Sequence, residues 1–116
     1  MLSEINACII LPTYNNAGTL ENVLERIMAV DAGARIIVVN DGSTDKTAQI
    51  LNKFKDTVRV INNEVNRGKG FSLVRGFRAA IESGFENAIT IDSDGQHYPE
   101  DIPLLVEKAK ENSDVV

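Results

Sequence analysis

The sequence predicts an α/β fold: a mostly parallel, Rossmann-like sheet flanked by helices on both faces. Three observations lead to this prediction. Short apolar segments of strand length alternate along the chain with segments that repeat apolar residues at helical spacing. The strand-like segments are almost continuously apolar, which is typical of parallel strands covered on both faces. A polar cluster follows each of them, and parallel α/β sheets bind ligands at the carboxyl ends of their strands.

The predicted strands come first in each strand–helix unit. They cover residues 7–11, 36–39, 58–61 and 88–91. The predicted helices lie between and after them, because apolar residues recur there at intervals of three and four. These helical stripes run through residues 20–28, 47–54, 73–81 and 102–109. Right-handed crossovers should connect the strands.

Small polar residues and glycine mark the expected helix ends. Asn16 or Thr19 is expected to cap the first helix, and Ser43 or Thr44 the second. Gly84 follows the third apolar stripe and is a plausible stop for that helix.

Composition and charge exclude several classes of function. The chain has 116 residues, one domain's worth at most, and a formal net charge of −5, which argues against broad nucleic-acid binding and against a basic membrane-surface patch. Cys8 is the only cysteine, so no intrachain disulfide forms, and its apolar surroundings predict an inert core residue.

The sequence shows no signal peptide and no apolar run approaching the roughly 20 residues that span a bilayer. We expect a cytoplasmic location, which for the full-length protein includes the inner face of the membrane. Residues 113–116 resemble the start of a fifth strand, so we expect the chain to be the first half of a larger α/β domain. The alternative is a frayed tail.

The strongest chemical signal is a pair of acids after the fourth apolar segment. Asp92 and Asp94 are two residues apart, and on an extended strand such residues point to the same side. Two convergent carboxylates suit a hard divalent cation such as Mg²⁺ or Mn²⁺, which commonly brings a phosphate-bearing substrate. His97, the only histidine, lies beside this pair, with a structural role as the alternative.

The other polar clusters carry weaker signals. Tyr14 offers a flat face for stacking a nucleobase, and Asp41 can accept a hydrogen bond from a base or a ribose hydroxyl. Arg67 and Lys69, with the amides that open the next helix, can hold a diphosphate. Taken singly, each cluster can also be read as a helix cap or a solvated turn.

Taken together, these clusters resemble the motifs of the family 2 glycosyltransferases. The matching segments are Ile-Leu-Pro-Thr-Tyr-Asn at 10–15, Val-Val-Asn-Asp-Gly-Ser-Thr-Asp at 38–45, Asn-Arg-Gly-Lys-Gly at 66–70 and Asp-Ser-Asp-Gly-Gln-His at 92–97. They follow one another over nearly the whole chain, which is most similar to the branch of polyprenyl- and dolichyl-phosphate sugar transferases. The resemblance implies a GT-A fold, a nucleotide-diphospho-sugar donor, Mn²⁺ or Mg²⁺, and inversion at the transferred sugar.

The resemblance also implies roles for individual residues. Residues expected to bind the donor nucleotide are Pro12, Thr13, Tyr14, Asn15, Asp41, Gly68, Lys69, Asp92 and Ser93; those expected to bind the metal are Asp92, Asp94 and Gln96. Many members have Glu where Asn16 stands and Asp where Asn40 stands, so the base stays open between UDP and GDP.

Residues 1–116 would then be the nucleotide-sugar-binding portion of a longer glycosyltransferase domain, with an acceptor that includes lipid or polyprenyl phosphates. Members that use a general base carry it in the second half of the domain, beyond Val116, so no catalytic residue is assigned in this chain. The isolated chain is expected to be inactive.

Two other readings stay open at this point. A dehalogenase-type phosphatase would use Asp92 as nucleophile and Asp94 as acid and base, although such enzymes usually carry Thr or Val where Gln96 stands. A receiver-like, non-enzymatic binding module also gathers acids at strand ends. A Rossmann dehydrogenase is disfavoured because no G-x-G-x-x-G follows the first strand.

Overall fold

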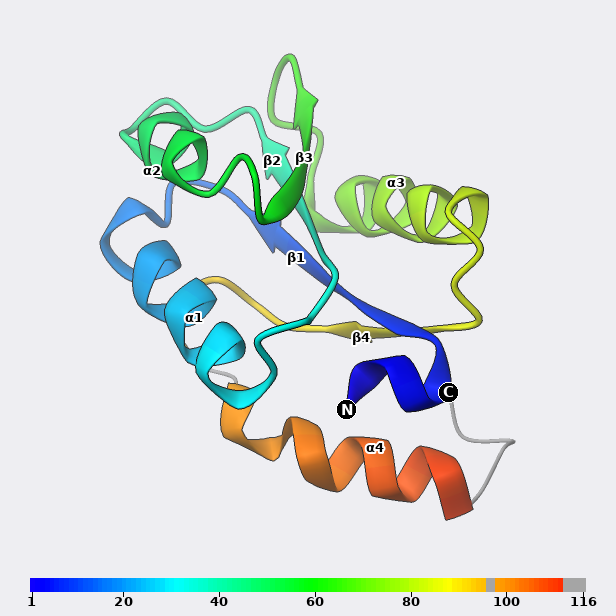
Figure 1. Cartoon of the computed structure of the whole chain (residues 1–116). Coiled ribbons are helices and arrows are strands. Elements are labelled where there is room, and N and C mark those ends of the chain that lie inside the picture. The colour runs from blue at the N-terminus through cyan, green and yellow to red at the C-terminus, as the bar shows by residue number, and fades with distance from the viewer. Residues whose placement is uncertain (96–97, 112–116) are drawn as a thin grey trace.

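The computed structural model describes residues 1–95 and 98–111. Within these residues lies a four-stranded sheet with the order β3-β2-β1-β4, parallel at each of its pairings (Figure 1). The strands are β1 (Ala7–Thr13), β2 (Ile36–Asp41), β3 (Val58–Asn63) and β4 (Asn87–Thr90). The helices are α1 (Ala17–Val30), α2 (Thr47–Lys53), α3 (Lys69–Glu82) and α4 (Ile102–Glu111), with short 3₁₀ turns η1 (Leu2–Ile5) and η2 (Pro99–Asp101).

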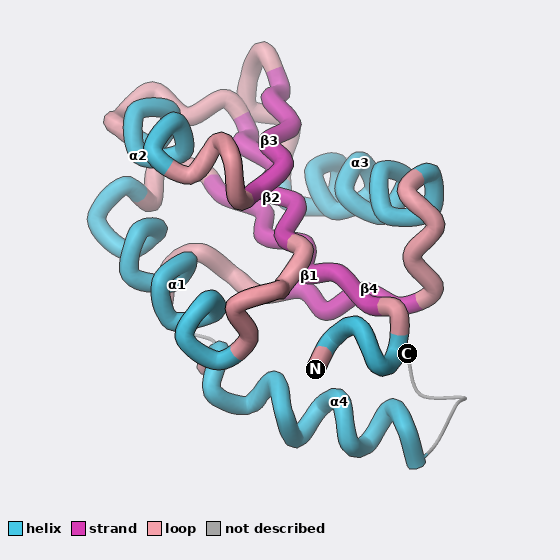
Figure 2. Tube along the Cα trace, viewed as in Figure 1, coloured by secondary structure: helices cyan, strands magenta, loops and turns pink. Residues whose placement is uncertain are grey.

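The helices cover both faces of the sheet, as predicted. Buried residues of α1, α2, α4 and η1 pack on one face, and buried residues of α3 pack on the other (Figure 2). The chain moves outward from β1 through β2 to β3, and α3 then returns it to the far side of β1, where β4 pairs. The strand order therefore reverses between β1 and β4, and ligand crevices in α/β sheets lie at such a point.

Strand β1 is an inner strand of the sheet, and its side chains pack against helices on both faces. Each residue of β1 is buried, and its side chains alternate between the two faces: Ile9 and Leu11 join the cluster under α1, whereas Cys8 and Ile10 join the cluster under α3. At Gly76 of α3 a Cβ would lie 2.5 Å from the Ile10 side chain, so glycine permits this close approach. Burial raises the pKa of Cys8, as expected for an inert core thiol.

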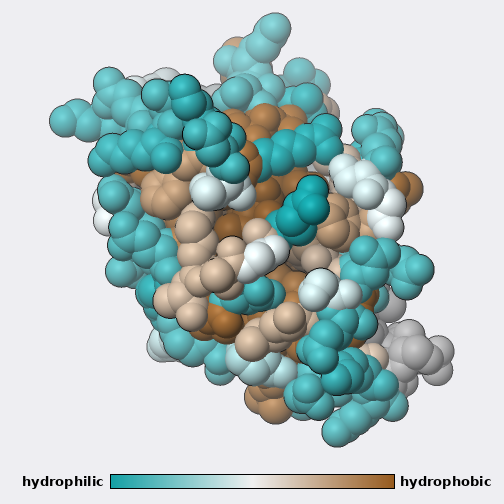
Figure 3. Space-filling model, in the orientation of Figure 1, coloured by the Kyte–Doolittle hydropathy of each residue, from teal (hydrophilic) through white to brown (hydrophobic). Residues whose placement is uncertain are grey.

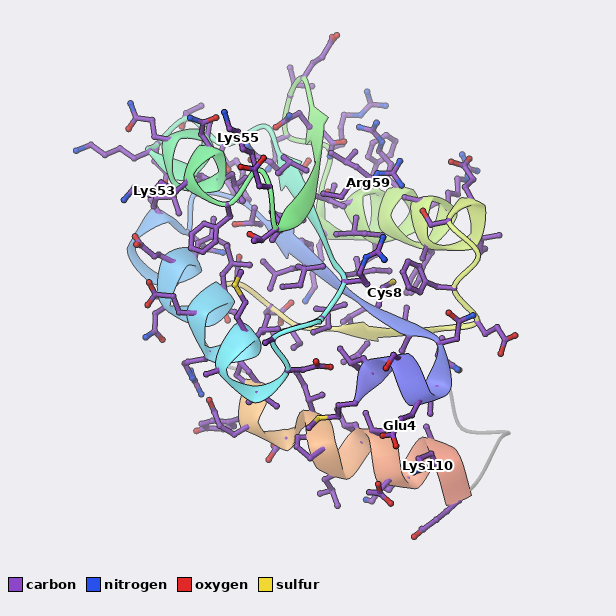
Figure 4. The ribbon with its side chains drawn as sticks, viewed as in Figure 1. Glu4, Cys8, Lys53, Lys55, Arg59 and Lys110 are labelled. Carbon is purple, nitrogen blue, oxygen red and sulfur yellow. The ribbon has the colours of Figure 1, made fainter. Side chains whose placement is uncertain are left out.

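The periphery is less enclosed. Figure 3 shows apolar residues in the middle of the face seen in Figure 1, with hydrophilic residues around them. Lys110 of α4 and Glu4 of η1 form an ion pair at 3.4 Å that joins two distant parts of the chain on the surface (Figure 4). Among the described residues, none of the helices combines the length and the apolar character that crossing a bilayer requires.

The types of all predicted elements are confirmed, but the strand ends differ. The first three strands run to Thr13, Asp41 and Asn63, two residues beyond the predicted ends. These polar residues stay in the ladder because β1 pairs with β2, and β2 with β3, up to the last residue. The fourth strand instead ends at Thr90, before the predicted end at residue 91.

Gly84, with a φ of 86°, follows the end of α3 at Glu82 as predicted, but the predicted side-chain caps of the first two helices were wrong. Asn16 precedes α1, but neither it nor Thr19 makes a side-chain cap bond to the helix amides. Lys46 precedes α2, and Asp45 rather than Ser43 or Thr44 accepts the hydrogen bond from the Thr47 amide. Partners on neighbouring loops, described below, take up several of these polar side chains.

Candidate functional site

A cavity of about 280 Å³ opens at the carboxyl end of the sheet, between the turns that follow the strands. It gathers every described residue predicted to contact donor or metal, except Asn15. It is lined by Pro12, Thr13, Tyr14, Asn16, Asp41, Asn66, Gly68, Lys69, Ser72, Asp92, Ser93 and Asp94. Gln96 and His97, also considered for the site, lie outside the described residues.

The β1–α1 turn forms one wall of the cavity. Tyr14 is 45% exposed, so its ring is available to a ligand. Thr13 is 2% exposed, and its hydroxyl is the one buried side-chain polar atom in the described part of the chain without a hydrogen-bond partner. Because buried hydroxyls are ordinarily paired, an orphan lining a cavity indicates a place where a bound polar group fits.

Asn15 is not among the lining residues, and it links the β1–α1 turn to the turn that follows β2. Its amide donates to the Ser43 hydroxyl at 3.0 Å, and its side-chain oxygen accepts from the amides of Thr44 and Asp45. Its φ of 51° lies in the left-handed region, which asparagine tolerates better than most residues. The nucleotide contact predicted for Asn15 stays a prediction. In the structure its side-chain oxygen binds the amides of the next turn.

Asp41 at the end of β2 is 4% exposed and organises the opposite wall. Its Oδ1 accepts hydrogen bonds from the Arg67 amide and the Asn63 side chain, and its Oδ2 accepts one from the Gly68 amide. Burial by itself would raise the pKa of Asp41, but these donors outweigh it and hold the pKa below its ordinary value. The carboxylate therefore stays charged and keeps capacity for a further donor.

Asn63 is a buried partner that the sequence analysis did not single out. Its side-chain nitrogen donates to Asp41 and to the Ser72 hydroxyl, and its oxygen accepts from the guanidinium of Arg75. The signal available in the sequence was a pair of amides, Asn62 and Asn63, at the end of a strand. The network fixes the β3–α3 turn against β2.

Glycines allow the turns to approach one another. At Gly42, with a φ of 70°, a Cβ would lie 2.5 Å from the Asn66 amide nitrogen, so the turns after β2 and β3 are in contact there. Gly68 has a φ of 97° and precedes Lys69, where α3 begins. The first amides of α3 have no partners within the helix, and such a helix end attracts anions.

The acidic pair reaches the cavity in an unexpected way. The strand ends at Thr90, and Asp92, Ser93 and Asp94 lie in the non-strand segment after it. Both acids line the cavity, but the predicted alternation of side chains along a strand does not explain why they do so. The ammonium of Lys69 lies 2.7 Å from Asp92 Oδ1, with exposed side-chain fractions of 60% and 22%. This ion pair joins the start of α3 to the segment of Asp92, Ser93 and Asp94, which we call the acidic turn.

The donor set suits a hard divalent cation in part. The described residues hold no cluster of three or more His, Cys, Asp or Glu side chains that could enclose a metal ion. Mg²⁺-type ions, however, are commonly bound by one or two carboxylates together with substrate phosphates and water. Two carboxylates beside a helix N-terminus fit that mode.

Comparison with known proteins identifies the family. The family model for glycosyl transferase family 2 matches residues 8–116. The chain belongs to this family. The phosphatase and receiver-like readings are therefore not favoured.

Relatives of the chain include proteins named as undecaprenyl-phosphate and dolichol-phosphate sugar transferases. The chain is 34% identical over 126 residues to an undecaprenyl-phosphate 4-deoxy-4-formamido-L-arabinose transferase of Pectobacterium carotovorum, covering 100% of this chain and 37% of that protein. It is 38% identical over 112 residues to a dolichol-phosphate mannosyltransferase of Pyrococcus furiosus, covering 92% and 31%. The chain thus spans about a third of the length of these relatives.

A solved structure confirms the expected GT-A architecture. It is the glucosyl-3-phosphoglycerate synthase of Mycobacterium tuberculosis, determined with Mn²⁺, uridine diphosphate and glucosyl-3-phosphoglycerate. The likeness has a TM-score of 0.73 at 28% identity and covers 91% of this chain and 40% of that one.

Proposed function

We propose that the cavity binds the nucleoside diphosphate of a sugar donor, and that the intact protein transfers this sugar with inversion to a lipid or polyprenyl phosphate. Residues 1–116 are then the donor-binding portion of the transferase. The observation that carries the proposal is one cavity that combines an exposed aromatic ring, an orphaned buried hydroxyl, a helix N-terminus and two carboxylates.

Each wall of the cavity suits one part of the donor. The Tyr14 ring would stack on the base, with Pro12 beside it and the Thr13 hydroxyl able to pair with a buried polar group. Asp41 would accept from the base or ribose with its remaining capacity, while its present bonds hold the wall in place. Gly68, Lys69 and the first turn of α3 would face the phosphates.

Asp92 and Asp94, with Gln96 as a further candidate, would hold Mn²⁺ or Mg²⁺ beside the diphosphate. Relatives solved with Mn²⁺ support this choice. When bound, the cation neutralises charge on the departing diphosphate. The Lys69 ammonium lies 2.7 Å from Asp92 Oδ1, and its long side chain would let it contact the departing diphosphate as a further positive charge.

The acceptor side follows from the relatives and from chemistry. Both curated relatives are named for polyprenyl- or dolichol-phosphate acceptors. A phosphate acceptor is already anionic and can attack the sugar without a general base, in contrast to a hydroxyl. We therefore propose that the intact protein works at the cytoplasmic face of a membrane that contains its lipid acceptor.

Isothermal titration calorimetry of the intact protein with UDP and GDP tests the proposal. Tight binding of one nucleotide in Mn²⁺, at least tenfold weaker binding in EDTA, and no binding of inorganic phosphate are expected. Equal affinity with and without the chelator would contradict the metal assignment, and binding of phosphate alone would contradict the donor assignment.

A further inference from the structure

The acidic turn needs an anchor, because the sheet does not extend to it. The last described ladder bond on this strand runs from the Ile91 amide to the Ile10 carbonyl, and the chain then leaves β1. Asp92 and Asp94 lie in the turn beyond, yet both reach the same cavity. Something other than strand geometry must therefore fix their direction.

Ser93, between the two acids, provides that anchor. It is 1% exposed. Its hydroxyl accepts a hydrogen bond from the Asn16 side chain at 2.7 Å and donates one to the Pro12 carbonyl at 3.2 Å. Its carbonyl oxygen accepts a hydrogen bond from the Thr19 hydroxyl at 2.5 Å.

These bonds tie the acidic turn to the start of α1 and to the β1–α1 turn. The tie consists of Ser93, Asn16, Thr19 and the Pro12 carbonyl, and we call it the Ser93 clasp. It contacts the acidic turn between its two carboxylates and holds the segment that carries Tyr14 at its other end.

We propose that the Ser93 clasp positions the Asp92 and Asp94 carboxylates relative to the β1–α1 turn, which carries Tyr14. By doing so, it determines how much a divalent cation strengthens donor binding. Ser93 and Thr19 act through the acids rather than on the cation. The inference rests on the proposed function, because it concerns the metal-dependent part of donor binding.

Two substitutions each remove one hydroxyl of the clasp with little change of volume. Thr19→Val deletes the hydroxyl that donates a hydrogen bond to the Ser93 carbonyl. Ser93→Ala deletes the hydroxyl that accepts from the Asn16 side chain and donates to the Pro12 carbonyl. Thr19→Ser keeps a hydroxyl and should restore the bond. Thr57→Val is the matched control, because the Thr57 hydroxyl also donates to a carbonyl, that of Phe54, just before β3 and away from the cavity.

The readout is the ratio of nucleoside diphosphate affinities in Mn²⁺ and in EDTA, measured by calorimetry on the intact protein, with Mn²⁺ binding alone followed by electron paramagnetic resonance. Thr19→Val and Ser93→Ala should weaken Mn²⁺ binding roughly 10- to 100-fold, as loss of groups supporting metal ligands does, and should bring the ratio close to one. The affinity of Thr19→Val in EDTA should change little, and Thr19→Ser and Thr57→Val should keep the wild-type ratio.

The outcomes separate the two proposals. If the wild type binds in a Mn²⁺-dependent way and both variants retain its ratio, the clasp is overturned and the donor site stands. If the wild type binds neither Mn²⁺ nor nucleotide, both are overturned. If Ser93→Ala does not fold, Thr19→Val with its Thr19→Ser rescue decides the matter alone.

Discussion

Asp41 ends β2 and Asp92 follows β4, so both acids lie at the carboxyl edge of one sheet, but the chain surrounds them differently. Asp41 is almost fully buried and takes two backbone amides and one side chain as donors. Asp92 faces the cavity beside the largely exposed ammonium of Lys69.

The difference shows that a carboxylate at a strand end does not have one role. Where fixed amides surround it, the carboxylate is part of the scaffold, and its removal leaves buried donors unpaired. Where a long cation and a cavity face it, the carboxylate can exchange partners when a ligand binds. The cavity thus has a scaffold half around Asp41, held mainly by the chain's own hydrogen bonds, and a ligand half around Asp92 and Asp94.

The largest expected effect breaks the ligand half. Asp94→Asn in the intact protein should lower turnover by roughly 100-fold or more, because the charge that holds the cation at the leaving group is lost. Thermal unfolding should change little. Asp56→Asn, at an exposed position away from the cavity, is the matched control and should leave both quantities unchanged. Wild-type activity in Asp94→Asn would contradict the role of the acidic pair.

The scaffold half should respond in the opposite way. Asp41→Ala should lower the free energy of unfolding by about 3 kcal/mol, because the Arg67 and Gly68 amides and Asn63 lose a charged acceptor. Chemical denaturation measures this change. A stability equal to that of Asp94→Asn would show that the two halves do not differ.

Acidification should expose the same contrast. The lowered folded-state pKa of Asp41 means that its contribution to stability is complete above the ordinary aspartate pKa, near 4, and is lost as the pH falls through the folded-state value. Denaturation from pH 7 to pH 2.5 should therefore show the stability gap between wild type and Asp41→Asn shrinking below about pH 4. A gap that stays constant would mean that Asp41 is not charged in the folded protein.

The smallest expected effect concerns the link between the turn after β1 and the turn after β2. Asn15→Gly keeps the left-handed backbone accessible but removes the acceptor for the Thr44 and Asp45 amides, and should cost about 1 kcal/mol. Asn6→Gly is a matched control, with a φ of 48° and a side-chain bond to the Gly84 carbonyl at the other end of the sheet. Both should lower stability, but nucleotide affinity should fall several-fold in Asn15→Gly alone, since Asn15 adjoins Tyr14.

Much of this organisation could be predicted from local patterns. Apolar runs and helical spacing predicted each strand and helix, because burial of one helix stripe and of both strand faces imposes those periods. Cys8 was expected in the core because it stands in an apolar run.

The errors arose where a polar side chain had a choice of partners. Ser43 was expected to cap α2 but accepts from Asn15 instead, and Asn16 was expected to cap α1 but donates to Ser93. Both partners are distant in the sequence, so local rules for helix ends could not find them.

The sequence by itself determined the order of elements, the parallel sheet and the residue types at its carboxyl edge, because these follow from local periodicity and from where apolar runs stop. The tertiary structure alone decided which acid is enclosed by amides and which lies beside an exposed lysine. That choice depends on turns separated by dozens of residues meeting in space, where burial and the supply of hydrogen-bond donors are set jointly.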